Sequence, residues 1–234
     1  MRQLFKVSIS LLVLLLTLMF PAYAGTVNLG GGFSGGNFSV NVSSIKEQRF
    51  KTIYKQQYDF SCGSATLASL LSFHYDDVVD ELMVFKDMYS NGDQQKIQKQ
   101  GFSLFDMKLY LSRRGYRSNG FKISLNQLAK AEIPAITIIN NRGYMHFVII
   151  KGSDEKEVLV GDPALGIKVY SRAEFEKMWN KQIIFVIQDK KDIASNHYQT
   201  QEEWDLRVKG HLGLAVDHSS LALFNILQPS AIDF

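Results

Sequence analysis

Cys62 is the residue best suited to covalent chemistry, and it is the only cysteine in the chain. The thiolate is the reactive form of cysteine, and the first turn of a helix stabilises it through unpaired N–H groups and a favourable dipole. CGSATLASLLSFH follows the N-cap candidates Asp59 and Ser61, which predicts a helix beginning at Cys62. Gly63 then leaves room for close approach of backbone and substrate. A single cysteine is equally an ordinary core residue, so its function depends on partners elsewhere in the chain.

The partners expected for Cys62 come from two predicted strands, 144–152 and 157–162, which are separated by a turn signal. In a hairpin centred on Asp154, residues whose numbers sum to 308 lie opposite one another. His146 and Asp162 then become cross-strand neighbours with Cβ atoms about 5 Å apart. Such a carboxylate accepts the imidazole N–H, orients the ring and stabilises its protonated form. A slip of one residue would place the two side chains on opposite faces.

A fourth group is needed to stabilise an oxyanion, and Gln56 precedes Cys62 by six residues. Its amide and the Cys62 N–H together would serve an oxyanion. Gln57 is an adjacent rival, and a glutamine before a helix is commonly a solvated surface residue. His146 and Asp162 also have ordinary structural uses when each is considered singly. Their occurrence with a helix-start cysteine favours a nucleophile, base and orienting acid acting together.

The elements that must position these residues change in type near residue 120. Helical patterns and caps predict three helices first, at 62–74, 78–88 and 104–114. β-branched runs then predict strands at 134–140, 144–152, 157–162, 166–170 and 182–188, with short helices at 125–130 and 174–180. Helices followed by consecutive strands predict an α+β fold with an antiparallel sheet. Tyr144 and Trp179 are expected either to line a peptide cleft or to pack in the core.

Residues 1–24 have the layout of a secretory signal peptide. Arg2 and Lys6 precede an apolar run over 7–20, and Ala22-Tyr23-Ala24 ends it. A retained membrane anchor is the alternative, although the run is shorter than the roughly 20 residues that span a bilayer. We therefore expect a periplasmic or secreted protein without a membrane span after removal of the signal.

Composition excludes an electrostatic nucleic-acid binder and a wholly disordered chain. The charge of +3 falls to 24 − 23 = +1 without Arg2 and Lys6, so an electrostatic nucleic-acid binder is not expected. A hydrophobic content of 46% and an aromatic content of 12% are enough to bury a core, which excludes a wholly disordered chain.

Four segments resemble, in order, the C39 family of papain-like cysteine peptidases, also called bacteriocin-processing or double-glycine peptidases. They are Gln56-x5-Cys62-Gly63-x-Ala65, Ile133-Pro134-Ala135, Met145-His146-Phe147-Val148 and Val160-Gly161-Asp162-Pro163. The resemblance covers roughly residues 50–188 and implies a papain-like fold. It also implies Cys62 as nucleophile, His146 as base, Asp162 as orienting acid and Gln56 as the oxyanion-hole residue. The implied reaction is cleavage after a Gly-Gly pair in a leader or precursor peptide, without metal or organic cofactor.

Two departures qualify the resemblance. Ser61 stands where the family usually has aspartate before the cysteine. Family members commonly form the cytosolic front end of an export transporter, whereas this chain begins with a predicted signal. It is more similar to stand-alone exported C39 proteins, including those encoded with functional-amyloid secretion systems. The expected partners are therefore a peptide or protein precursor and a secretion or amyloid-export system.

The resulting organisation is a signal peptide (1–24), a flexible Gly/Ser-rich lead (25–48), a C39-like peptidase domain (49–190) and a C-terminal extension without an assigned role (191–234). Two other functions remain open. A C39-like binding module would dock a precursor or a secretion channel without cutting it. An acyl transferase would use the same thioester chemistry but pass the acyl group to an amine. HLGLAVDH (211–218) suggests a metal-binding histidine pair, but it lacks a third ligand.

Overall fold

The structure is a computed structural model that describes residues 26–30, 37–41, 44–58, 61–179 and 181–206. The expected signal peptide and the histidine pair at 211–218 lie outside the described residues. Residues 1–47 and 48–234 form separate compact units. Among the described helices, none has the length and apolar character needed to cross a membrane.

The first unit contains a β-hairpin. Strands β1 (Thr26–Gly30) and β2 (Asn37–Asn41) pair antiparallel, with Val27 opposite Val40. Valine and other strand-forming residues in both segments favour this pairing. The lead that we expected to be flexible therefore includes paired strands. Helix α2 (Ile45–Arg49) follows and spans the boundary between the units.

The second unit is built on a six-stranded antiparallel sheet in the order β3-β8-β4-β5-β6-β7. Its strands are β3 (Ser118–Lys122), β4 (Ala135–Asn141), β5 (Tyr144–Ser153), β6 (Glu157–Asp162), β7 (Gly166–Ser171) and β8 (Ile183–Ile187). The five predicted strands are confirmed to within two residues at each end. β3 was not predicted because its sequence, SNGFK, is rich in poor strand formers; its ladder with β8 provides the pairing that local propensity lacks.

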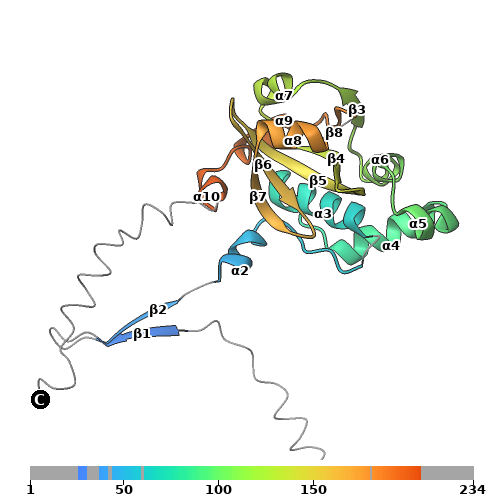
Figure 1. The fold of residues 1–234 in the computed structure, drawn as a ribbon. Coiled ribbons are helices and arrows are strands. Elements are labelled where there is room, and N and C mark those ends of the chain that lie inside the picture. Colours follow the sequence, from blue (N-terminus) through green and yellow to red (C-terminus); the bar gives the residue numbers. More distant parts are fainter. Residues whose placement is uncertain (1–25, 31–36, 42–43, 59–60, 180, 207–234) are drawn as a thin grey trace, which may run out of the picture. The chain divides into compact units, whose positions relative to one another are not determined.

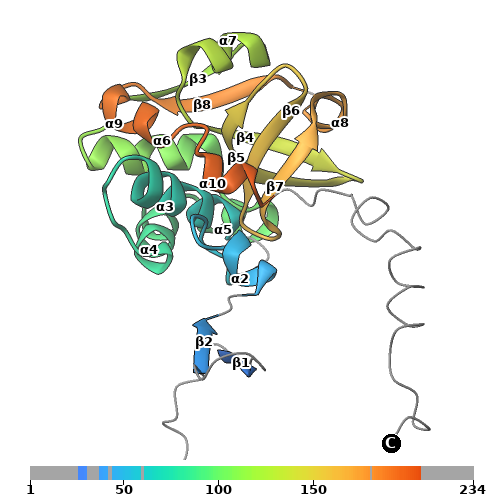
Figure 2. The ribbon, with the colours of Figure 1, turned by 90° about the vertical axis from the view of Figure 1, so that its left-hand side faces the viewer.

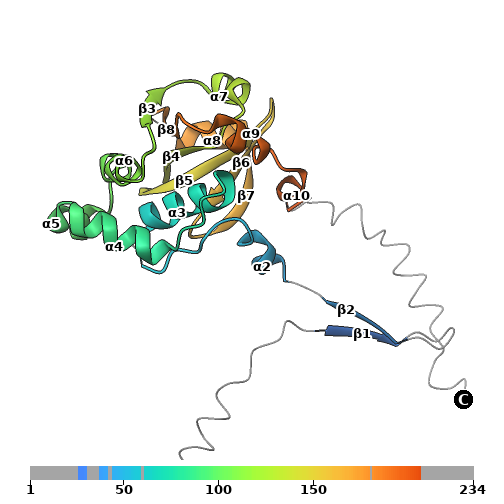
Figure 3. The same cartoon turned by 180° about the vertical axis from the view of Figure 1, so that it is seen from behind.

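Helices lie on both faces of this sheet, with α3 on one face and α8 on the other (Figures 1 and 3). The helices of this unit are α3 (Cys62–His74), α4 (Glu81–Asn91), α5 (Gln94–Gln100), α6 (Leu104–Arg113), α7 (Leu125–Ala131), α8 (Arg172–Met178), α9 (Lys191–Asn196) and α10 (Gln201–Trp204). Helices that precede an antiparallel sheet confirm the α+β prediction.

Helix α3 is buried along almost its whole length, which fixes the position of its first residue. Leu67, Leu70 and Leu71 are fully buried. A helix that is apolar on all sides belongs in a core. Two of its polar side chains bond to the helix backbone: Thr66 Oγ1 donates to the Cys62 carbonyl at 2.6 Å, and Ser69 Oγ donates to the carbonyl four residues earlier. The start of α3 is therefore held on a rigid element.

Candidate active site

Cys62 is the first residue of α3, as the sequence predicts, and only 8% of it is exposed. Burial raises the pKa of the Cys62 thiol, and backbone hydrogen bonds from Phe147 and Gly63 oppose this effect without overcoming it. The negative charge of Asp162 raises the pKa further. The backbone N–H groups at the start of α3 lower the pKa as expected, but desolvation of the sulfur outweighs them.

His146 and Asp162 are hydrogen-bonded, with 2.9 Å between imidazole Nε2 and carboxylate Oδ2. Their side chains are almost completely buried. The other carboxylate oxygen, Oδ1, accepts from the backbone N–H groups of Ala164 at 2.8 Å and Leu165 at 3.2 Å. Both oxygens of Asp162 are thus engaged, and the carboxylate is fixed in an orientation that holds the imidazole.

The strand register differs from the expected one. Ile149 pairs with Gly161, so opposite residue numbers sum to 310 at this end of the β5–β6 ladder. Continuing that register places Asp162 opposite Val148, one diagonal step from His146. Diagonal neighbours remain within reach of long and aromatic side chains. The predicted direct opposition is wrong because the hairpin contains a bulge and is not centred on residue 154. The expected contact survives because 308 and 310 are both even, so both registers place the two side chains on one face.

The second imidazole nitrogen, Nδ1 of His146, is buried and has no hydrogen-bond partner among the described residues. The next residue, Phe147, lies beyond the β6 ladder and its backbone contacts α3 instead: it hydrogen-bonds to the Cys62 sulfur and accepts from Thr66 Oγ1 at 3.3 Å. The start of α3 therefore lies beside the histidine-bearing part of β5. With Nε2 donating to Asp162, Nδ1 is the nitrogen with a free lone pair.

Gln56 is connected to the turn that follows Asp162. Its backbone N–H donates to the Pro163 carbonyl at 3.0 Å, and its Oε1 is buried without a partner among the described residues. Gln57 is exposed, and its backbone hydrogen-bonds to Glu81. The structure therefore ties Gln56, rather than its rival, to the segment that carries Asp162.

Sequence reasoning missed Glu81, which supports Ser61, the residue before Cys62. Its Oε1 accepts from Ser61 Oγ at 2.9 Å, and only 6% of Glu81 is exposed. Burial raises the pKa of Glu81, although the hydrogen bond from Ser61 opposes this. Ser61 Oγ also accepts from the Tyr58 backbone at 3.1 Å. The one sequence signal was Ser61 itself: a serine can pair with a neighbouring carboxylate where the family's aspartate would repel it.

Packing inside the protein requires a glycine at position 63. A Cβ at this position would lie 2.9 Å from Phe102 Cβ and 3.2 Å from Met107 Cε. The absence of a side chain allows the segment before α6 to pack against the first turn of α3. Gly63 thus accommodates neighbouring side chains of the protein.

The two aromatic residues near the predicted cleft have different positions. The Tyr144 ring stacks on the His146 ring, with 5.2 Å between centroids and 27° between planes, and Tyr144 is 48% exposed. Trp179 is buried and its Nε1 donates to Thr137 Oγ1 at 2.6 Å. Of the two, Tyr144 lies at the candidate site and Trp179 belongs to the core.

A helix-start cysteine beside a strand histidine, on helices that precede an antiparallel sheet, defines the papain-like class of cysteine peptidases. The family model described as "Peptidase C39 family" matches residues 50–191. Two relatives carry the description "Probable functional amyloid protease FapD". The relative from Pseudomonas aeruginosa is 42% identical over 73% of this chain and 72% of its own length. The relative from Pseudomonas fluorescens is 40% identical over 79% of this chain and 81% of its own length.

These matches show that the chain belongs to the peptidase C39 family and is a cysteine peptidase. Among solved structures, the peptidase domain of Streptococcus ComA, a bifunctional ABC transporter, is 18% identical with a TM-score of 0.49. That match covers 58% of this chain and 96% of the ComA domain.

Proposed function

We propose that this chain is an exported cysteine endopeptidase that cleaves a precursor or leader peptide, with Cys62 as nucleophile, His146 as base, Asp162 as orienting acid and Gln56 as oxyanion donor. The observation that carries the proposal is the His146–Asp162 hydrogen bond of 2.9 Å, which leaves Nδ1 without a partner among the described residues, while the backbone of the next residue, Phe147, bonds to the Cys62 sulfur.

In the proposed reaction, His146 Nδ1 takes the proton of Cys62 as the sulfur attacks the scissile carbonyl carbon. This general-base route suits a thiol whose pKa is raised by burial. Asp162 stabilises the imidazolium, while the Gln56 amide and the Cys62 N–H stabilise the tetrahedral oxyanion. The imidazolium then protonates the leaving amine. Water attacks the thioester, His146 removes its proton, and the thiol is regenerated as the acid product leaves.

The proposed substrate is a precursor in a functional-amyloid secretion system, cut after a Gly-Gly-type site. The amyloid context is supported by the descriptions of the two Pseudomonas relatives. The Gly-Gly preference is supported by the family resemblance, and glycine at the cut suits a narrow cleft because it has no Cβ. We further propose that residues 1–24 are a cleaved signal and that the enzyme acts in the periplasm or outside the cell, with the export system as a partner.

Cleavage of a candidate precursor tests the proposal. The full chain is incubated with an exported amyloid precursor containing a Gly-Gly pair, and products are identified by mass spectrometry. We expect cleavage by the unaltered chain and by the His197→Ala control, and none by Cys62→Ala, Cys62→Ser or His146→Ala. Undiminished cleavage by both Cys62 variants would refute the assignment. Binding without cleavage would support the docking module, and products carrying an added amine would support acyl transfer.

A matched pair of substrates tests the site preference. Replacing the second glycine of the pair by valine introduces a branched Cβ at the cut, so we expect cleavage there to be lost. The same replacement three residues away serves as the control. Equal cleavage of both substrates would contradict the Gly-Gly rule without affecting the assignment of Cys62.

A further inference from the structure

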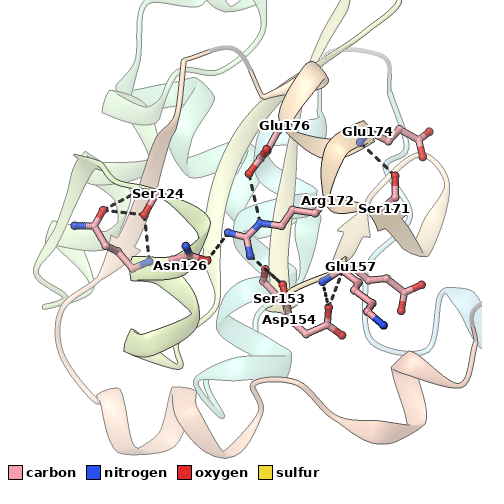
Figure 4. Close-up of polar contacts among 11 residues, drawn as sticks. Ser124, Asn126, Ser153, Asp154, Glu157, Ser171, Arg172, Glu174 and Glu176 are labelled. Atoms are coloured by element: carbon pink, nitrogen blue, oxygen red, sulfur yellow. Dashed lines mark hydrogen bonds and ion pairs between the residues drawn. The ribbon is translucent and has the colours of Figure 1, made fainter.

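The β5–β6 hairpin is clamped at its turn (Figure 4). Asp154 Oδ1 accepts from the backbone N–H groups of Lys156 and Glu157, each at 2.7 Å. Arg172 donates through Nη1 to the Asp154 carbonyl at 3.1 Å and through Nη2 to Asn126 Oδ1 at 2.6 Å. These contacts fix the geometry of the turn and hence the register of the strands that leave it.

The register at the turn is the wrong one for the active site. Ser153 pairs with Val158, so opposite numbers sum to 311 there. If that odd register continued, His146 and Asp162 would lie on opposite faces of the sheet. The ladder shifts between Ile150 and Gly152, which leaves Lys151 as the extra residue of a β-bulge, and beyond it the sum is 310. The bulge therefore brings the base and its orienting acid to one face.

Lys151 is tied to two distant segments of the chain. It is 1% exposed, and its Nζ donates to the Thr52 carbonyl at 3.1 Å and to Thr52 Oγ1 at 2.8 Å. Nζ also forms an ion pair with Glu203 on α10, which lies against β5 (Figure 2). The Lys151 carbonyl accepts from the Gln199 backbone at 2.9 Å. The bulge is thus held from both its backbone and its side chain.

A buried ion pair contributes little net stability, because removing both charges from water has a large free-energy cost. Burial lowers the pKa of Lys151, and only the charge and hydrogen bond of Glu203 oppose this effect. Well-packed apolar residues often replace buried ion pairs without loss of stability, so stability alone does not account for the Lys151–Glu203 pair. The geometry at stake here is that of the site: Thr52 precedes Gln56 by four residues, and Lys151 follows His146 by five.

We propose that Lys151 and Glu203 are positioning residues, whose buried ion pair holds the bulge that places His146 on the face of Asp162. Glu203, which lies in a segment to which sequence analysis assigned no role, thereby positions a residue of the proposed site. This inference rests on the proposed function of His146 as the base.

The test compares Glu203→Gln, Lys151→Met and the double variant Lys151→Met/Glu203→Leu with a control on the same helix, Glu202→Gln, whose side chain is exposed. Thermal unfolding and the kcat and KM of precursor cleavage are measured for each. We expect Glu202→Gln to behave as the unaltered chain. Each single variant should lose tenfold or more in kcat with KM changed less than threefold, since small misplacements of a reacting group are costly.

The double variant separates positioning from simple stability. Its paired apolar side chains should restore the melting temperature, but they lack the donor that binds the Thr52 carbonyl, so kcat should stay low. Recovery of both quantities would overturn the inference. If the double variant does not fold, Glu203→Gln decides the question, and unaltered kcat in that variant overturns the inference. Failure of the proposed function is distinguishable, because His146→Ala would then remain active.

Discussion

Replacing Asp162 by asparagine keeps the size of the side chain and leaves one carbonyl oxygen where two acceptors are needed. In the native protein, Oδ2 faces the imidazole of His146 and Oδ1 accepts from the backbone of Ala164 and Leu165. If the asparagine oxygen serves the backbone, its NH₂ faces Nε2. The imidazole must then accept at Nε2 and carry its proton on Nδ1, the nitrogen proposed to act as base. If the amide flips, its NH₂ opposes two backbone N–H groups.

The first orientation predicts a large loss of activity, and the second loses the carboxylate charge that stabilises the imidazolium. General-base catalysis contributes about 10²- to 10⁴-fold to a rate, and the first orientation removes it by selecting the wrong tautomer. Each factor of ten corresponds to about 1.36 kcal/mol, so the expected rise in the barrier is about 2.7–5.4 kcal/mol. Stability should fall less, by about 1–3 kcal/mol, which is the range for an unsatisfied buried polar group.

The assay measures kcat/KM for precursor cleavage by Asp162→Asn, together with thermal unfolding to show that the variant is folded at the assay temperature. We expect kcat/KM to drop at least 100-fold. The reasoning would be refuted by a folded Asp162→Asn variant that retains kcat/KM within threefold of the unaltered chain, because the imidazole would then need no orienting carboxylate.

Three further predictions follow from the same geometry. Gly63→Ala should destabilise the fold by about 1–3 kcal/mol, measured by denaturant unfolding, because the new Cβ meets Phe102 at 2.9 Å; unchanged stability would contradict this packing. Tyr144→Ala should lower kcat about two- to tenfold by removing a ring stacked on His146, worth about 0.5–1.5 kcal/mol, and an unchanged kcat would argue against the stacking. Because burial raises the pKa of Cys62, iodoacetamide should alkylate it more slowly at pH 7 than a free cysteine, with the rate rising only at alkaline pH; faster alkylation at pH 7 would contradict the raised pKa.

Local sequence patterns predicted most of the helices and strands, because the local preferences of these segments agree with the secondary structure that they adopt in the fold. The β-branched runs form the predicted strands, and Cys62 begins its helix. β3 escaped prediction because its residues are poor strand formers, and its partner β8 is distant in sequence. Helix α10 also escaped, since it has four residues and is anchored to the protein by Glu203 and other long-range contacts.

The sequence indicated which residues form the candidate site, but not the contacts that hold them in place. Side chains alternate between the two faces of a strand, so a register error of two residues leaves each side chain on the same face. His146 and Asp162 could therefore be placed on one face although the predicted register was wrong. The bulge at Lys151 has no local signature, because lysine continues an ordinary strand pattern and its partner lies 52 residues away. Glu81 was missed for the same reason, since its contact with Ser61 spans 20 residues.

The cooperation of Cys62 and His146 is tested most directly by a peptide ending in Gly-Gly vinyl sulfone, whose covalent capture is followed by intact-protein mass spectrometry. The chain has one cysteine, so each thiol adduct reports on Cys62. We predict one adduct per chain, with a capture rate at least 100-fold lower in His146→Ala and unchanged in His197→Ala. Equal capture rates in the unaltered chain and in His146→Ala would show that the imidazole does not serve the sulfur.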